Sequence, residues 1–435
     1  MAFSTIQGSG GAPDSFVGTS GVDAIGIVNS NGNFFLGAQE SDDVINVLNS
    51  GSALYGGVLS TSTLKGGSGA DTFTIGTAGN ATVFTGLYLN GNADRDTITF
   101  LAADTILAST IHGGAANDTM TAGVTTSSLV NGNKGQDTIT LVGAGTSASV
   151  YGGQGNDVVT TALAFTTGVM AGDLGNDNLS VTGAVSINRS TFNGGDGNDV
   201  LNVAAAGAAA NTGVVLDGGA GADVLTGPLL GTAATLLGGD GTDTLTMTGG
   251  TATLNGGEGI DTLAMAAGTA TALWSSSADY GAGASAASTA LVAAGDAITG
   301  FTTTTDKLAV GNITSGVAQV GAAAALLAGW NFNTSGVLVT SANAIALDFV
   351  QGTSTYANLA TAVAQAAGNL TGDAGDTGII QILDGGAGAA ATIINVAVTL
   401  GTAAAGRAIN NTDTVALVST EDAVAVAADF TFATA

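Results

Sequence analysis

Apolar and small polar residues alternate along the first three-fifths of the chain, on both sides of a recurring glycine-rich segment. Two residues after the aspartate that closes this segment stands an apolar residue, such as Ile139, Val159 or Leu179. Two residues before its first glycine stands another, such as Val150 or Phe192. This alternation predicts that a short strand enters each glycine-rich turn and another leaves it, with the apolar side chains stacked in a narrow core.

The segment follows the pattern G-G-x-G-x-D and returns about every 20 residues, which is the period of a solenoid with one coil per repeat. Complete copies begin at Gly66, Gly152, Gly194, Gly218, Gly238 and Gly256 and close at Asp71, Asp157, Asp199, Asp223, Asp243 and Asp261. Copies with substituted glycines close at Asp23, Asp118, Asp137 and Asp177, and the most degenerate copies close at Asp43 and Asp96. The repeat predicts an all-β fold, a parallel β-roll or β-solenoid of about 12 coils over residues 1–264.

The motif also supplies the ligands that a hard cation prefers. Glycine at the first, second and fourth places allows positive φ and a sharp bend, which exposes carbonyl oxygens on one side. The aspartate adds a carboxylate, and Ca²⁺ accepts six to eight oxygen ligands with flexible geometry. Two turns stacked at the spacing of neighbouring strands, about 4.8 Å, can share one ion. We therefore expect a single column of Ca²⁺ ions along one edge, weaker in the degenerate N-terminal copies.

Tight turns that hold no metal use the same residue types, so one or two copies of the motif would indicate turns alone. Many copies in register favour the metal instead, because the chain carries a formal net charge of −27 and the acidic residue stays at the sixth place.

The repeat resembles the calcium-binding nonapeptide G-G-x-G-x-D-x-U-x of the RTX (repeats-in-toxin) family, and residues 152–160 match it most closely. The resemblance covers residues 14–264. It implies that the motif aspartates, together with carbonyl oxygens of the motif glycines, hold Ca²⁺ between neighbouring turns. The family commonly repeats the motif every nine residues, which gives each coil two metal turns. Here the opposite turns, such as residues 162–168, lack the motif.

The motif stops after Leu263, and the chain that follows differs in character. Residues 265–290 are expected to form a cap or linker, and residues 291–435 a β-rich domain with short helices at 322–327 and 356–367 and strands at 378–383 and 392–400. The stretch from Asp296 to Phe301 and the Asp306-Lys307 turn are similar to the segment that follows the β-roll in serralysin-type RTX proteins. Residues 428–435 resemble the C-terminal signal of type I secretion substrates, which implies the type I secretion machinery as a partner.

Composition narrows the classes of function. With 33 acidic residues against 6 basic ones, the chain is a poor partner for nucleic acid or an anionic membrane. It has no cysteine, hence no disulfide framework and no thiolate metal site. No stretch of apolar residues is long enough for a membrane span, so no membrane insertion is expected, and residues 1–8 lack the features of a Sec signal. Together with the resemblance, these features predict a secreted protein, extracellular or at the cell surface.

The chain offers little for catalysis, and we expect that it is not an enzyme. The zinc protease domain of serralysins requires H-E-x-x-H, whereas His112 is the only histidine and is expected to be an exposed turn residue. No G-x-S-x-G elbow and no P-loop occur. Acid pairs such as Asp42-Asp43 fall in the register of the calcium motif, and two tryptophans make a poor sugar-binding platform.

The leading hypothesis is an extracellular calcium-binding structural protein, a subunit of a surface layer, filament or matrix that folds and assembles on Ca²⁺ after secretion. Its expected partners are further copies of itself and a cell-surface polysaccharide. The competing hypothesis is a secreted adhesin, or an ice- or carbohydrate-binding module, that uses a threonine-rich face with T-x-T pairs beginning at Thr72, Thr97, Thr138 and Thr244. Asn202 and Ala264 interrupt that pattern, which favours ordinary strand propensity. A third hypothesis is a fragment or partner of a larger RTX enzyme.

Overall fold

The structure of the 435-residue chain is a computed structural model. It describes residues 2–7, 14–28, 34–48, 61–76, 81–207, 211–231, 233–265, 268–274, 284–285, 296–299, 307–310, 338–341, 344–350, 377–384, 392–399, 414–421 and 430–432. The chain divides into two compact units, Met1–Ala234 (unit 1) and Thr235–Ala435 (unit 2), which are described separately. Among the described residues, no helix is long and apolar enough to cross a membrane.

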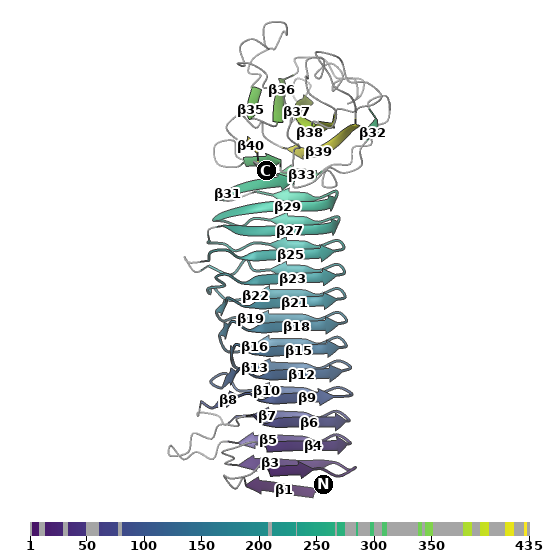
Figure 1. The fold of residues 1–435 in the computed structure, drawn as a ribbon, viewed down its shortest axis with the longest axis vertical. Coiled ribbons are helices and arrows are strands. Elements are labelled where there is room, and N and C mark those ends of the chain that lie inside the picture. Colours follow the sequence, from purple (N-terminus) through teal and green to yellow (C-terminus); the bar gives the residue numbers. More distant parts are fainter. Residues whose placement is uncertain are drawn as a thin grey trace. The chain divides into compact units, whose positions relative to one another are not determined.

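In unit 1 the chain winds into stacked coils whose strands pair in parallel with those of the next coil (Figure 1). The strands that leave the motif turns, preceded by β1, form one sheet: β1 (Ala2–Gln7), β3 (Asp23–Val28), β5 (Val44–Leu48), β7 (Thr72–Ile75), β10 (Thr97–Phe100), β13 (Thr119–Ala122), β16 (Thr138–Leu141), β19 (Val158–Thr161), β22 (Asn178–Val181), β24 (Val200–Asn202) and β26 (Val224–Thr226). This arrangement confirms the predicted all-β parallel solenoid.

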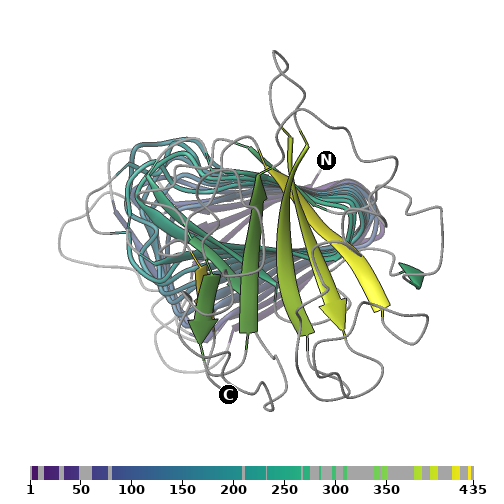
Figure 2. The same cartoon turned by 90° about the horizontal axis from the view of Figure 1, so that it is seen from above.

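The strands that enter the motif turns form a second sheet: β2 (Asp14–Val17), β4 (Phe34–Glu40), β6 (Thr63–Ser68), β9 (Tyr88–Asn92), β12 (Thr110–Ala115), β15 (Leu129–Lys134), β18 (Ser149–Gln154), β21 (Val169–Leu174), β23 (Thr191–Asp196) and β25 (Val215–Ala220). Seen along its length in Figure 2, unit 1 shows its coils superimposed on one another. Each motif turn therefore stands directly beside the motif turns of the coils before and after it.

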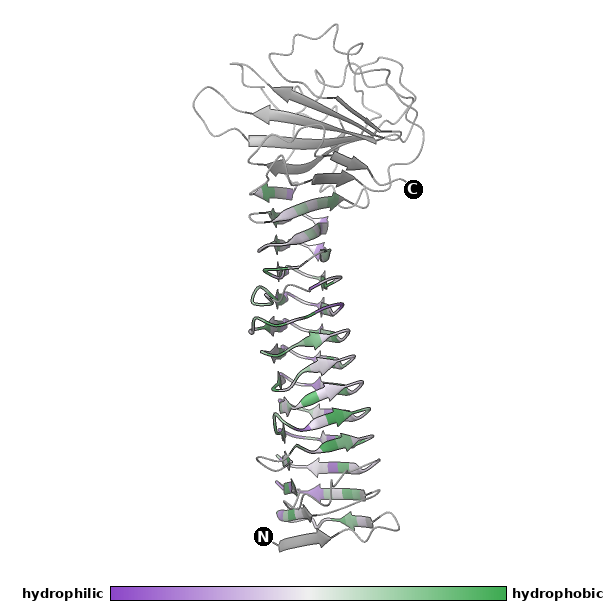
Figure 3. Ribbon diagram, turned by 90° about the vertical axis from the view of Figure 1, so that its left-hand side faces the viewer, coloured by the Kyte–Doolittle hydropathy of each residue, from purple (hydrophilic) through white to green (hydrophobic). Residues whose placement is uncertain are grey.

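The core of unit 1 is the pair of apolar columns that the sequence alternation predicts. Residues two places after the motif aspartate pair in register, as in Ile98 with Met120 and Met120 with Ile139, and each of these is at most 1% exposed. In Figure 3 the strands of unit 1 carry both apolar and hydrophilic residues. Burial of one such side chain stabilises the fold by about 2 kcal/mol, so the columns hold successive coils together. Phe16, on β2, is only half-buried.

A third, short sheet in the middle coils was not predicted. It consists of β8 (Val83–Thr85), β11 (Thr105–Leu107), β14 (Val124–Thr126), β17 (Gly145–Thr146) and β20 (Phe165–Thr166). Phe84, Ile106 and Phe165 point from these strands into the core and are at most 1% exposed. The coils in this region therefore have three sides, and the edge opposite the motif turns is itself hydrogen-bonded from coil to coil.

Unit 2 contains further parallel strands and a mixed sheet. β28 (Thr244–Thr246), β30 (Thr262–Ala264) and β33 (Asp296–Thr299) pair in parallel, as do β29 (Thr251–Gly259), β31 (Thr269–Trp274), β34 (Lys307–Val310) and β40 (Phe430–Phe432). β27 (Ala234–Gly241) begins at the unit boundary. The mixed sheet consists of β35 (Leu338–Ser341), β36 (Ala344–Val350), β37 (Thr377–Asp384), β38 (Thr392–Thr399) and β39 (Thr414–Glu421), with the short β32 (Ala284–Ser285) against β39.

The strands predicted at 378–383 and 392–400 are confirmed as β37 and β38. The predicted helices at 322–327 and 356–367 lie outside the described residues, as does most of the predicted linker. The predicted domain limits at residues 264 and 290 stay predictions.

Candidate functional site

The motif turns of unit 1 stack along one edge of the solenoid, called here the motif edge, on the right in Figure 1. All the aspartates that close the motifs are buried. None is more than 4% exposed in either unit: Asp23, Asp43, Asp71, Asp96, Asp118, Asp137, Asp157, Asp177, Asp199, Asp223, Asp243 and Asp261. Carboxylates are almost never buried to this extent without a partner, so their surroundings carry the chemistry of the site.

From Asp43 to Asp223, one carboxylate oxygen of each motif aspartate is held by the backbone of the preceding coil. The N–H of Asp137 donates to Oδ1 of Asp157, and the N–H of Asp157 donates to Oδ1 of Asp177, both at 2.6 Å. The same bond recurs without interruption from Asp23 to Asp223, at 2.6–2.8 Å. This aspartate ladder ties every coil of unit 1 to the next by a side chain as well as by the sheets.

The other carboxylate oxygen, Oδ2, is buried and accepts no hydrogen bond from the described residues. This holds for eight consecutive motif aspartates of unit 1: Asp43, Asp71, Asp96, Asp118, Asp137, Asp157, Asp177 and Asp199. A buried polar atom left without a partner costs about 1–3 kcal/mol, and more when it is charged. A column of such atoms therefore indicates a partner that the protein chain itself does not supply.

In most motifs the first glycine keeps the space next to Oδ2 open. A Cβ on Gly132 would collide with Oδ2 of Asp137 and lie 2.6 Å from the carbonyl oxygen of Gly152, one coil later. A Cβ on Gly66 would meet Oδ2 of Asp71 and the carbonyl oxygen of Gly91 in the same way. Each such pair, an aspartate Oδ2 and the first-glycine carbonyl of the next coil, is called here an oxygen site.

The glycines predicted to be ligands contribute in two ways: some place a carbonyl oxygen at an oxygen site, and others leave room for the site because they lack a Cβ. The carbonyl oxygens of Gly152, Gly218 and Gly256 converge with the Oδ2 atoms of Asp137, Asp199 and Asp243, respectively. Gly66, Gly194 and Gly238 are the glycines whose missing Cβ leaves room for the oxygen sites of their own coils. Both roles belong to the first place of the motif.

The expectation that all three motif glycines serve positive φ was wrong for the first one. In the motif that ends at Asp71, φ is positive at the second and fourth places, +117° at Gly67 and +113° at Gly69, but not at Gly66. The first glycine is needed for space, whereas the other two are needed for conformation. Asparagine and aspartate tolerate positive φ, which explains why Asn92 (φ 81°) and Asp94 (φ 68°) replace glycine in a degenerate copy.

The first place is also the place that varies least. It is glycine in every motif except the one that ends at Asp43, where Ala38 stands. Ala38 is fully buried, and at this place it carries the Cβ that the glycines of the other coils lack. The degenerate copy at Asp96 keeps Gly91 and an open oxygen site. Replacement of the second and fourth glycines therefore does not remove the aspartate from the ladder.

Burial raises the pKa of the ladder carboxyls, and the N–H of the preceding aspartate lowers it by less. The pKa reaches about 8 at Asp96 and about 7 at Asp71 and Asp157. The pKa values of the remaining carboxyls are about 7 at Asp118 and Asp199, about 6 at Asp137 and Asp177, and raised at Asp43 and Asp223. Desolvation is the main cause throughout, so near neutral pH these carboxyls require either a proton or a cation.

The donor set of the oxygen sites suits a hard cation. Within the described residues, no three His, Cys, Asp or Glu side chains gather at one point, so an ion here would draw most of its ligands from backbone carbonyls. Carboxylate and carbonyl oxygens without nitrogen or sulfur fit the calcium and magnesium class, not the zinc class. The residues present therefore fit the metal class that the motif predicts.

Two buried aspartates were not predicted as site residues. Asp296, on β33, is fully buried, and its Oδ1 accepts the N–H of Asp261 at 2.9 Å, which continues the ladder within unit 2. Ile298, two residues later, is the signal that could have identified it. Asp104, near the opposite edge of unit 1, accepts N–H groups of Thr82 and Leu101 at 3.0 and 3.2 Å with its two oxygens. Asp104 therefore has no orphaned oxygen.

His112 is not the exposed turn residue that was expected. It lies on β12 and is half-buried, because the strand continues into the first places of the motif. Its ring packs edge-on against Tyr88 with centroids 5.8 Å apart. Burial lowers the pKa of His112, and a hydrogen bond with Asn133 raises it by less.

Comparison with protein-family models and with curated proteins gives no match. Among solved structures, the chain is similar to one described as the X-ray crystal structure of a hyperactive, Ca²⁺-dependent, β-helical antifreeze protein from an Antarctic bacterium. The identity is 17%, the match covers 69% of this chain and 84% of that chain, and the TM-score is 0.37. The fold described above rests on the strands and registers of this chain alone.

Proposed function

We propose that this chain is an extracellular calcium-binding structural protein. The observation that carries the proposal is the column of buried Oδ2 atoms along the motif edge of unit 1, all but that of Asp43 beside a first glycine whose Cβ would fill the space. A proton on each carboxyl would also neutralise the column. Calcium explains in addition why the motif keeps space free, and why it places a carbonyl oxygen of the next coil beside several of the carboxylates.

In this proposal the motif aspartates and the first-glycine carbonyls of neighbouring coils hold the ions. Calcium would supply positive charge to buried carboxylates and a bridge between coils that are about 20 residues apart in the sequence. At a formal charge of −27, the metal-free coils repel one another, and ion binding becomes part of the folding free energy. Folding would then follow export into a calcium-rich medium through type I secretion.

We further propose that the folded chains assemble into a surface layer, filament or matrix and that the protein has no catalytic role. Three features support this: a coil stack that bound calcium would rigidify, an acidic chain that calcium can bridge between copies, and a sequence without a catalytic motif. A polysaccharide of the cell surface is the expected anchor.

The test combines calorimetry, circular dichroism and electron microscopy on the full chain. We expect metal-free protein to bind several Ca²⁺ ions per chain, to lose its β spectrum in EDTA, and to form ordered sheets or filaments only with calcium. Asp157→Asn should bind one ion fewer than the wild type, whereas the exposed Asp196→Asn should bind the same number. A β spectrum that EDTA leaves unchanged, with no calcium bound, would refute calcium binding. Calcium binding without assembly would refute only the structural role.

A second candidate function is favoured by a feature of the first sheet. The threonines one place after the motif aspartate, Thr72, Thr97, Thr119 and Thr138, pair in register across four coils. A second row of Thr74, Thr99, Thr121, Thr140 and Thr160 runs beside it. This threonine array is longer than the isolated T-x-T pairs indicated, and it would suit a binding module for a flat, repeating ligand such as ice.

Freezing-point measurements distinguish this candidate from the structural role. The binding module requires thermal hysteresis in dilute, monomeric protein and its loss in Thr121→Lys. The control variant, Thr191→Lys, carries the same charge on the other sheet. Absence of hysteresis in the wild type would exclude ice as the ligand of this face.

A further inference from the structure

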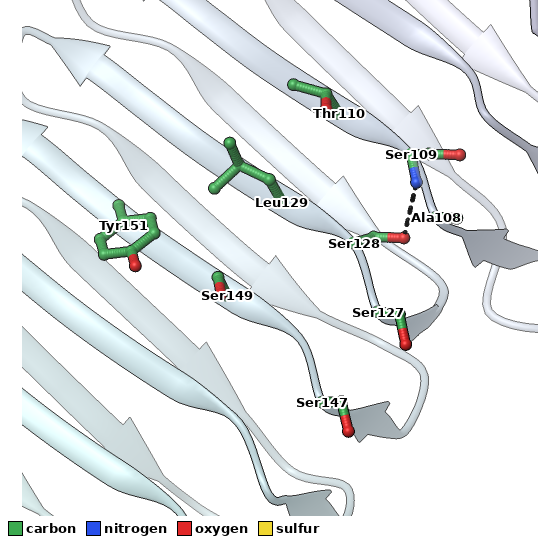
Figure 4. Close-up of a pocket in the computed structure, with 9 residues that line it drawn as sticks. All are labelled: Ala108, Ser109, Thr110, Ser127, Ser128, Leu129, Ser147, Ser149 and Tyr151. Carbon is green, nitrogen blue, oxygen red and sulfur yellow. Dashed lines mark hydrogen bonds between the residues drawn. The ribbon is translucent and has the colours of Figure 1, made fainter.

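A groove crosses three neighbouring coils of unit 1, away from the motif edge. Its volume is about 560 Å³, and the side chains that line it include Thr110, Ser127, Leu129, Ser149 and Tyr151. Figure 4 shows Tyr151 at one end, Leu129 and Ser149 between, and Ser127 with Ser147 at the other end. Across the three coils the groove is lined in register by Thr110, Leu129 and Ser149, and on the last of these coils it extends from Tyr151 to Ser147.

The floor of the groove is fixed by serines that bond to the backbone. The hydroxyl of Ser109 donates to the carbonyl of Leu107 at 2.8 Å and accepts the N–H of Leu87 at 3.0 Å. The hydroxyl of Ser128 donates to the carbonyl of Thr126 at 2.8 Å and accepts the N–H of Ser109 at 3.0 Å (Figure 4). Because these hydroxyls hold neighbouring coils together, the groove is a built feature and not a gap between loose side chains.

One end of the groove is formed by backbone turns with a defined conformation. Ala108, Ser127 and Ser147 each adopt a left-handed backbone conformation, with φ of 46–49°. The N–H of Ser127 donates to the carbonyl of Thr146 at 3.0 Å, and the N–H of Ala108 donates to the carbonyl of Thr126 at 3.1 Å. The chain therefore turns at the same place in each coil, and the side chains of Ser127 and Ser147 are exposed.

Several hydroxyl groups of the groove have no partner within the described residues. The side chains of Thr110, Ser127, Ser149 and Tyr151 make no hydrogen bond there, and they are half-buried or exposed. They can therefore both donate to and accept from a ligand without breaking a bond of the fold. Tyr151 adds an aromatic ring, whose face can stack on an apolar surface.

The chemistry of the groove selects the class of ligand. None of its lining side chains is charged, although the chain as a whole carries a formal charge of −27. A charged ligand would find no opposite charge there, and an apolar ligand would bury the free hydroxyl groups without hydrogen-bond partners. A neutral polyhydroxylated ligand matches both properties, with hydroxyl partners along its length and a ring face for Tyr151.

The spacing and the neighbouring residues favour an extended chain of sugars over a single one. Coils repeat at about 4.8 Å, a spacing similar to the length of one hexose unit in an extended glycan. Beside the groove, the outward positions of Tyr151, Asn131 and His112 pair in register, which continues a polar strip along the same direction. We propose that this groove binds a neutral, extended oligosaccharide, an inference independent of calcium binding at the motif edge.

The experiment measures binding of neutral hexasaccharides to the calcium-treated full chain by calorimetry. The probes are cellohexaose, xylohexaose and maltohexaose, with a galacturonate hexamer as the anionic comparison. We expect at least one neutral hexamer to bind and the galacturonate hexamer to bind at least tenfold more weakly. Tyr151→Ala should weaken the neutral complex about tenfold, and Ser149→Trp, which fills the groove, should abolish it.

The matched control variants lie on the same face of the sheet, at the positions that pair with Ser149 and Tyr151 two coils later. Thr191→Trp and Asn193→Ala stand two coils beyond Ser149 and Tyr151 on the same face, and should bind as the wild type does. Circular dichroism confirms that each variant is folded. The proposal is overturned if no neutral hexamer binds, if the galacturonate hexamer binds as tightly, or if the groove variants and the controls behave alike.

Discussion

Raising the pH of the calcium-free protein from about 5 to about 8 should destabilise it, whereas the stability of the calcium-saturated protein should change little over the same range. The folded-state pKa of the ladder carboxyls is raised, so the folded state holds more protons than the unfolded state between pH 3.8 and the raised values. Stability from these protons is fully present below pH 3.8 and is lost as the pH rises through about 6 to 8.

The size of the effect follows from single residues. Asp157 has a folded-state pKa of about 7 against an ordinary value of 3.8. A pH of 5 lies about 2 units below the raised pKa, and each unit corresponds to about 1.36 kcal/mol. The proton on Asp157 therefore contributes about 3 kcal/mol to the unfolding free energy at pH 5, and this contribution is lost by pH 8. Asp71, Asp118 and Asp199 have similar pKa values. The combined loss is comparable with the whole stability of an ordinary domain, about 5–15 kcal/mol.

The assay is thermal unfolding followed by far-UV circular dichroism, in EDTA and in calcium, at both pH values. In the proposed site calcium competes with protons for the same oxygens, so its stabilising effect should grow with pH and cancel most of the pH dependence seen in EDTA. Magnesium at equal concentration is the control for ionic strength. Equal melting temperatures at the two pH values in EDTA would refute the reasoning from buried carboxyls. A melting temperature that falls with pH as steeply in calcium as in EDTA would refute ion binding at Oδ2.

Other substitutions test the packing and the oxygen sites, each by denaturant unfolding or by calorimetry. Gly132→Ala should cost at least 2 kcal/mol of unfolding free energy because its Cβ would collide with a buried carboxylate, whereas Gly26→Ala, where a Cβ meets nothing within 4 Å, should be nearly neutral. Leu179→Ala should cost about 2–5 kcal/mol through the cavity that it leaves in a fully buried column, and a loss below 1 kcal/mol would contradict that packing. Ala38→Gly should open one oxygen site and add one calcium ion per chain, whereas Ala122→Gly, at another buried alanine, should leave the number of ions unchanged.

Much of unit 1 could be predicted because its determinants are local. An apolar residue two places from the motif, such as Ile139 or Val150, indicates which way its strand faces, and apart from the half-buried Phe16 these residues are buried. The third sheet escaped prediction because strands such as β17 are only two residues long and have no constant distance from the motif. A two-residue strand has no alternation to detect.

The oxygen sites could be predicted in kind but not in geometry. The motif shows that aspartate and glycine matter, yet the Oδ1 bond joins residues of different coils, such as Asp137 and Asp157, and depends on their register. The different duties of the three glycines likewise become visible only when the next coil is present, because the atoms that crowd Gly132 include the carbonyl oxygen of Gly152. Asp296 escaped prediction because 35 residues separate it from Asp261, which hides the period.

The aspartate ladder also determines how unit 1 responds to tension. Its hydrogen bonds run along the stacking direction, as do those of the three sheets. Tension along that direction loads these bonds end-on, and the coils detach one after another instead of shearing together. Each released coil lengthens the chain by about 20 residues, or about 70 Å when fully extended. A stretched molecule would therefore dissipate mechanical work in a series of small, similar steps, and calcium bound as proposed would raise the force of each step.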